Sequence, residues 1–129
     1  TATDTPVLIE DNTVTSTITF GDNLAISDVN VTLEIQHTWL GDLNIDLTSP
    51  QGTTRRLIDT GVCGNDDDID AIFDDAGVAL TCGGAPAITG TVMPLEDFAT
   101  FNGEESSGAW TLTVEDTAAF DTGAINNFT

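Results

Sequence analysis

His37 is the only histidine of the chain and the first residue to consider as a catalytic base. Such a base needs a nucleophile and an orienting acid beside it. The sequence has no Gly-x-Ser-x-Gly turn, no His-Glu-x-x-His helix and no Cys-x-x-Cys pair that would supply such partners. His37 also lies in phase with the apolar side of an alternating segment. We therefore expect a structural histidine and no catalytic residue in this chain.

The densest group of possible metal ligands is the segment NDDDIDAIFDDAG, which is rich in aspartate. Calcium takes several oxygen ligands, and a flexible aspartate-rich loop can provide them. The segment is not an EF-hand, because with Asp66 in the first position the motif's glycine and closing glutamate fall on Ala71 and Gly77. Paired carboxylates also serve in glycosidases, but their abundance here makes that signal uninformative. The residues leave two interpretations open, a calcium site and a solvated acidic loop.

Cys63 and Cys82 enclose this acidic segment. An even number of cysteines in a chain that looks exported favours a disulfide over two buried thiols. A thiolate metal site is a poorer alternative with one histidine available. A bridge of this span stabilises a domain by roughly 3 kcal/mol in the chain-entropy treatment. We expect a Cys63–Cys82 disulfide that closes the acidic loop.

The net charge of −20 comes from 22 acidic residues against Arg55 and Arg56, with no lysine. Such a surface repels nucleic acid and anionic membranes, because phosphate binding needs Lys and Arg. The acidity suits a secreted, monomeric protein kept soluble by its charge, and no apolar run is long enough to span a membrane. The first residues do not have the basic-then-apolar pattern of a signal peptide. We expect residues 1–129 to be a single domain excised from a longer exported precursor.

Alternating apolar and polar residues predict the strands that position these groups. Two such runs, residues 29–36 and 43–48, flank the turn-forming pair Gly41-Asp42. We expect them to form one antiparallel hairpin, with Trp39 at its turn. The small polar residues of Thr1–Pro6 predict a linker from a preceding domain.

The second half of the chain alternates less regularly. Residues 60–91 lack the period and predict a long loop, with its middle anchored to the core around Ile69 and Phe73, at most as one strand. Trp110 begins a strong alternating strand. Ile125 and Phe128 are out of phase and predict a bulge. About eight short strands separated by Gly, Asp and Pro turns predict an all-β sandwich.

Two blocks of the sequence resemble the P domain, or P/Homo B domain, of kexin- and furin-like proprotein convertases and of many secreted bacterial proteases. Together they cover about residues 25–128 in the order and spacing of that family. The matching motifs are His37-Thr38, Gly41-Asp42-Leu43, Ser49-Pro50, Gly52-Thr53, Phe101-Asn102-Gly103, Gly108-Ala109-Trp110-Thr111-Leu112, Asp116 and Asp121-Thr122-Gly123.

The resemblance implies a jelly-roll β-sandwich of about eight antiparallel strands. It also implies a non-catalytic domain that follows the catalytic domain of a secreted protease, most often a subtilisin-like serine endopeptidase. Its implied roles are folding support, stabilisation and substrate contact, with the catalytic domain of the same precursor as its partner. Because an aromatic at a solvent-facing turn tends to mark an interface, we expect Trp39 to contact that domain.

The resemblance also favours calcium, because bacterial members carry an Asp-rich segment ending in Phe-Asp-Asp, here Phe73-Asp74-Asp75. The alternative function is a calcium-stabilised carbohydrate-binding module, which is disfavoured because the chain has no tyrosine and only two tryptophans to stack on sugars. We expect a structural calcium ion, with ligands among Asp67, Asp74, Asp75, Asp116 and Asp121.

Overall fold

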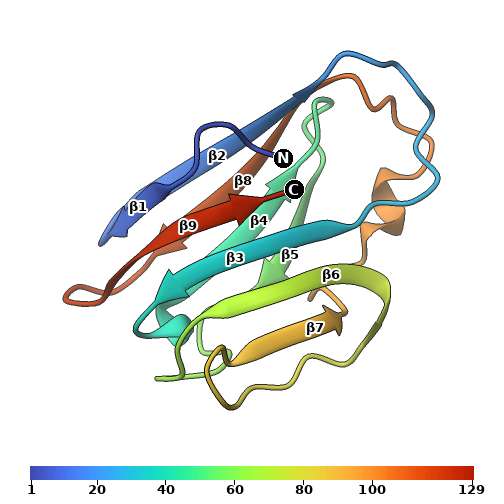
Figure 1. The fold of residues 1–129 in the computed structure, drawn as a ribbon. Helices are drawn as coiled ribbons and strands as arrows, with labels where there is room; N and C mark the ends of the chain where they lie inside the picture. Colours follow the sequence, from blue (N-terminus) through green and yellow to red (C-terminus); the bar gives the residue numbers. More distant parts are fainter.

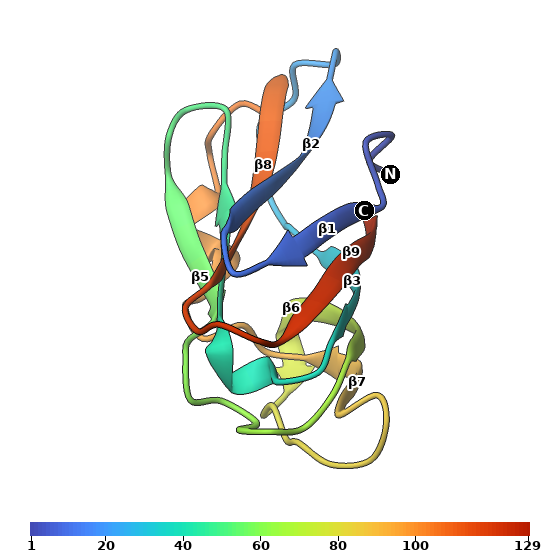
Figure 2. The same ribbon diagram turned by 90° about the vertical axis from the view of Figure 1, so that its left-hand side faces the viewer.

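The computed structural model describes residues Thr1 to Thr129 and is an all-β sandwich of two packed sheets (Figures 1 and 2). Nine strands and two short 3-10 helices follow one another along the chain. They are β1 (Val7–Glu10), β2 (Thr13–Phe20), β3 (Val31–His37), η1 (Leu40–Asp42), β4 (Leu43–Thr48), β5 (Thr54–Ile58), β6 (Ile69–Val78), β7 (Ile88–Val92), η2 (Phe98–Phe101), β8 (Gly108–Asp116) and β9 (Thr122–Phe128).

One sheet has five strands in the order β1-β9-β3-β6-β7, and the other has four in the order β2-β8-β4-β5. Figure 2 shows these sheets as two layers. All paired strands are antiparallel except β6 and β7, which are parallel. The predicted all-β sandwich is confirmed, with nine strands and with one parallel pair that the sequence did not predict.

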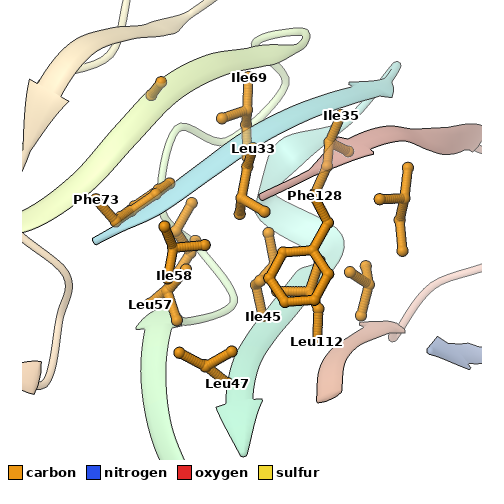
Figure 3. Close-up of a cluster of buried hydrophobic side chains, with 14 of the residues drawn as sticks. Leu33, Ile35, Ile45, Leu47, Leu57, Ile58, Ile69, Phe73, Leu112 and Phe128 are labelled. Atoms are coloured by element: carbon orange, nitrogen blue, oxygen red, sulfur yellow. The ribbon is translucent and has the colours of Figure 1, made fainter. Parts of the chain in front are cut away.

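The core lies between the two layers, because alternate residues of facing strands point inward. In β8 the inward residues are Trp110, Leu112 and Val114, as their alternation predicted. Figure 3 shows how side chains from both sheets meet there. The labelled residues are Leu33, Ile35, Ile45, Leu47, Leu57, Ile58, Ile69, Phe73, Leu112 and Phe128.

The predicted hairpin of residues 29–48 is wrong, because β3 and β4 lie in different sheets. β3 pairs with β6 and β9, whereas β4 pairs with β5 and β8. Residues 38–42 carry the chain from one layer to the other, and Leu40, only 1% exposed, packs into the core at this corner. Alternation shows which face of a strand is buried, but it does not identify the neighbouring strand.

The predicted long loop of residues 60–91 contains two strands, β6 and β7. Its signal was weak because Ala71 and Gly77 occupy strand positions. Gly77 is needed there, since a Cβ atom would lie 2.6 Å from the Val92 carbonyl carbon of β7. Close approach of two backbones, rather than a turn, explains this glycine.

The bulge predicted near the end of the chain is present. Opposite β3, Glu34 pairs with Asn127 and Ile35 pairs with Ile125, so Asn126 is the extra residue. The insertion brings both Ile125 and Phe128 to the core, where they are 0% and 2% exposed.

The amino-terminal residues are packed on the sandwich rather than free as a linker. The Ala2 N–H donates to the Phe128 carbonyl oxygen at 2.7 Å, and the Thr17 N–H donates to the Asp4 carboxylate at 2.9 Å. Figure 1 shows the two termini side by side. No helix of the structure has both the length and the apolar character needed to cross a bilayer.

Candidate functional site

His37 ends β3 and is buried, with 1% of its surface exposed. Its Nε2 lies 3.2 Å from Asp116 Oδ2, and its Nδ1 lies 2.9 Å from the Trp39 carbonyl oxygen. Neither side chain of the His37–Asp116 pair has any exposed surface. A buried carboxylate needs such a partner, because removing a charge from water is costly. Because both ring nitrogens contact partners inside the domain, His37 has the geometry of a structural residue.

Two turns meet around this pair at one end of the sandwich. Thr38 Oγ1 donates to Asp121 Oδ1 at 2.9 Å, and the Thr117 N–H donates to the Asp42 carbonyl oxygen at 2.9 Å. In Figure 1 the β3–β4 and β8–β9 connections lie at the same end of the fold. We call residues 37–42 and 116–121 together the corner platform.

The loop between β5 and β6 is hydrogen-bonded to the corner platform. The Leu40 N–H donates to the Asp66 carbonyl oxygen at 3.0 Å, and the Gly41 N–H donates to the Gly64 carbonyl oxygen at 2.7 Å. A Cβ atom on Gly41 would lie 2.8 Å from that same Gly64 oxygen, so the corner requires glycine there. The Asp68 carboxylate accepts the His37 N–H at 2.9 Å.

The corner platform gathers negative charge from distant parts of the sequence. Burial raises the pKa of Asp42, and the nearby Asp116 and Asp121 carboxylates raise it further, while His37 opposes them. The sequence reasoning treated Asp42 only as a turn residue. The charge group was not visible in the sequence because Asp42 lies more than 70 positions before Asp116 and Asp121.

Two aromatic side chains of the corner platform face solvent. Trp39 is 43% exposed at the corner, and Phe120 is 100% exposed in the β8–β9 turn. Phe120 also has a φ angle of 85°, which is unusual for a residue other than glycine. The sequence reasoning singled out Trp39 and missed Phe120, although an aromatic within a turn-rich segment was the available signal.

Residues 26–129 match the family profile described as the proprotein convertase P-domain. The chain belongs to this P-domain family. Strands β1 and β2 both precede the matched region, yet they pair with β9 and β8 and complete both sheets. The family resemblance noted in the sequence is thereby confirmed.

The P domain is similar to two proteins named calcium-dependent protease, from Trichormus variabilis and a Nostoc species. Each is 30% identical to it over 106 residues, which is 81% of this chain but 13% of the relative. The chain therefore spans about an eighth of the length of these relatives.

Two crystal structures show a similar fold. A serine protease of Aeromonas sobria superposes with a TM-score of 0.53 and 22% identity, covering 93% of this chain and 22% of that chain. The structure of that protease in complex with a chaperone superposes with a TM-score of 0.52 and 21% identity, covering 93% of this chain and 21% of that chain. At this level of identity the likeness concerns the fold.

The five aspartates predicted to bind calcium are divided between two places in the P domain. Asp116 and Asp121 lie in the corner platform. Asp67 precedes β6 and also lies near the platform, since the adjacent Asp68 accepts a hydrogen bond from the His37 N–H. Asp74 and Asp75 lie farther along β6, about 17 and about 20 Å from its start at roughly 3.3 Å per residue. No three acidic, histidine or cysteine side chains converge in a way that could hold a metal ion. The five residues as placed do not fit one calcium site.

Asp75 makes a hydrogen-bonded contact within the domain. Both of its carboxylate oxygens accept the Phe98 N–H, at 2.8 and 3.0 Å, at the start of η2. Phe98 is 1% exposed, so this contact ties β6 to a buried helical turn. Asp74 accepts the Ala76 N–H at 2.8 Å within its own strand.

Cys63 and Cys82 form a disulfide, as the sequence predicted, with their Cα atoms 5.4 Å apart. The bridge joins the loop before β6 to the loop before β7. It therefore holds the segment that contacts Leu40 and Gly41 and supports the corner platform from outside.

Proposed function

We propose that this P domain is a non-catalytic part of a secreted, subtilisin-like serine endopeptidase and follows the catalytic domain in the same polypeptide. Membership of the P-domain family carries this proposal. The similar sequences are parts of much longer proteins named as proteases, and the similar fold belongs to a serine protease. The buried His37 with its internal partners supports a structural domain rather than a second catalytic centre.

The proposed role is to stabilise the catalytic domain during folding and after export. A folded domain joined to it can bury part of its surface, and anything that binds the native state alone raises its stability. The test compares the full-length protease with a form lacking residues 1–129 and with a catalytic-serine variant. We expect the shortened form to be secreted in lower yield and to lose activity at a lower temperature.

The outcomes of this comparison are distinct. Full yield and full thermal stability of the shortened form would contradict the stabilising role. Activity that survives replacement of the catalytic serine would contradict the assignment to a serine endopeptidase.

We also propose that calcium stabilises this P domain, a proposal supported by the names of its two relatives. Because the five predicted aspartates do not converge, the proposal is limited to a small effect on stability. Its test is a comparison of the domain's melting temperature in EDTA and in calcium.

A further inference from the structure

Phe120 is not explained by the stability of the domain itself. It is 100% exposed, so its ring buries no surface within the fold. Its φ angle of 85° strains any residue that carries a Cβ atom, and glycine or asparagine would adopt this angle more easily. A strained, exposed aromatic is a reason to look for a binding role.

Trp39 and Phe120 belong to turns that are bonded to each other. The Thr38–Asp121 hydrogen bond and the two donors of Thr117 to the Asp42 carbonyl oxygen, at 2.9 and 2.7 Å, join the turns. The corner platform therefore presents two aromatic side chains at one end of the sandwich. Aromatic residues of this kind supply most of the energy of many protein interfaces.

The buried His37–Asp116 pair contacts the backbone of both turns. His37 Nδ1 contacts the Trp39 backbone, and Asp116 Oδ1 accepts the Ala118 N–H at 3.2 Å. One pair of side chains thus holds the backbone of both aromatic turns. A surface ordered in advance loses less conformational freedom on binding, which favours association.

The charge around the aromatics selects a basic partner. Asp42 and Asp121 lie within the platform, and neither arginine of this chain pairs with them. Arg55 and Arg56 both lie on β5, where Asp97, Glu96, Asp46 and Asp59 pair with them. A ligand with lysine or arginine beside an apolar group would complement this surface.

The corner platform lies away from the amino terminus of the domain. Ala2 bonds to Phe128 at the far end of β9, whereas Thr122 at the other end of that strand follows the platform. These two ends of β9 are about 20 Å apart. In the proposed protease the catalytic domain precedes Thr1, so the platform is the end more distant from that junction.

We propose that the corner platform binds basic protein substrates of the protease, with Trp39 and Phe120 as the apolar contacts and Asp42 and Asp121 as the acidic surroundings. This inference rests on the proposed function above. It assigns Trp39 a substrate as its partner instead of the catalytic domain that the sequence suggested.

The test uses the full-length protease and three substrates. These are casein, casein whose carboxyl groups have been converted to amines, and a short peptide that contains only the residues around the cleaved bond. We expect Phe120→Asn to lower kcat/KM for cationised casein, relative to the short peptide, at least about fivefold, as for loss of an interface hot spot. Asparagine tolerates the φ angle of this position, so the fold is retained.

Matched variants separate the platform from the rest of the surface. Trp39→Ala should act like Phe120→Asn, and Leu24→Ala, which removes a 67% exposed side chain at the other end, should leave the substrate ratio unchanged. Asp121→Asn should lower the preference for cationised over native casein, whereas Asp22→Asn should not. Added sodium chloride should reduce the preference of the unaltered protease.

Several results would overturn the inference. An unchanged substrate ratio in Phe120→Asn and Trp39→Ala would do so. An equal loss on all three substrates together with faster thermal inactivation would do so as well, because the platform would then pack on the catalytic domain. A full-length protein without serine-protease activity would overturn both this inference and the proposed function.

Discussion

The corner platform and the acidic strand β6 use their aspartates differently. In β6, Asp75 accepts the Phe98 N–H and Asp74 accepts the Ala76 N–H, so these carboxylates are occupied by backbone donors. In the corner platform, carboxylates from separate loops come together, and the pKa of Asp42 is raised by burial and by its acidic neighbours.

Density of charge along a sequence is therefore a poor guide to density of charge in space. Successive residues of a strand point to opposite faces, so Asp74 and Asp75 are directed apart although they are adjacent. Asp42 and Asp116 are far apart in sequence, yet β4 and β8 pair and place Leu43 opposite Asp116.

His37→Ala should destabilise the domain by about 3–5 kcal/mol, because it leaves the buried Asp116 carboxylate without its partner. Denaturant unfolding of the domain measures the change. Gln36→Ala is the control, since Gln36 is an exposed neighbour on the same strand. Equal stability of the two variants would show that the pair does not hold the corner platform together.

Asp75→Ala should lower the free energy of unfolding by about 1.5–3 kcal/mol, the usual contribution of a hydrogen bond to a charged group. The same unfolding experiment applies, with Asp70→Ala as the matched control on the exposed face of β6. If both substitutions had the same small effect, Asp75 would be a solvated residue like its neighbours.

Asp42→Asn should stabilise the domain at neutral pH by less than about 1 kcal/mol, since it removes a carboxylate that is unfavourable when ionised. The folded-state pKa of Asp42 lies above its ordinary value of 3.8, so the wild-type domain loses stability as pH rises through this interval. The gain from Asp42→Asn should therefore appear above the raised pKa and vanish below pH 3.8.

Melting temperatures measured between pH 3 and pH 8 test this sign. Asp22→Asn, at an exposed turn, serves as the control for removing one charge from the −20 total. A gain of the same size in the control would mean that the effect comes from net charge rather than from the corner platform.

Calcium should have the smallest effect, because its predicted ligands are divided between the two regions. Binding to the folded state would raise the melting temperature with calcium concentration, and we expect about 4 °C or less over EDTA. Magnesium and matched sodium chloride are the comparisons, since screening of an acidic surface acts with any cation. An equal rise in all three would contradict specific calcium binding by the domain.

Features that depend on neighbouring residues could be predicted from the sequence. Alternation in β3, β4 and β8 identified strands and their buried faces, because period 2 is a local property of extended chain. The phase change between Ile125 and Phe128 identified the bulge in the same way. The count and position of Cys63 and Cys82 identified the disulfide.

Which strands pair and which side chains meet is evident only in the folded domain. The alternation of apolar and polar residues in β3 and β4 is compatible with pairing in one sheet or with placement in two. The strands that pair with each of them show that the chain crosses between the sheets at Leu40. The meeting of His37 with Asp116, and of Asp42 with Asp121, depends on that same crossing between sheets. Contacts between residues so distant along the chain leave no periodic trace in the sequence, because they are set by the packing of whole strands.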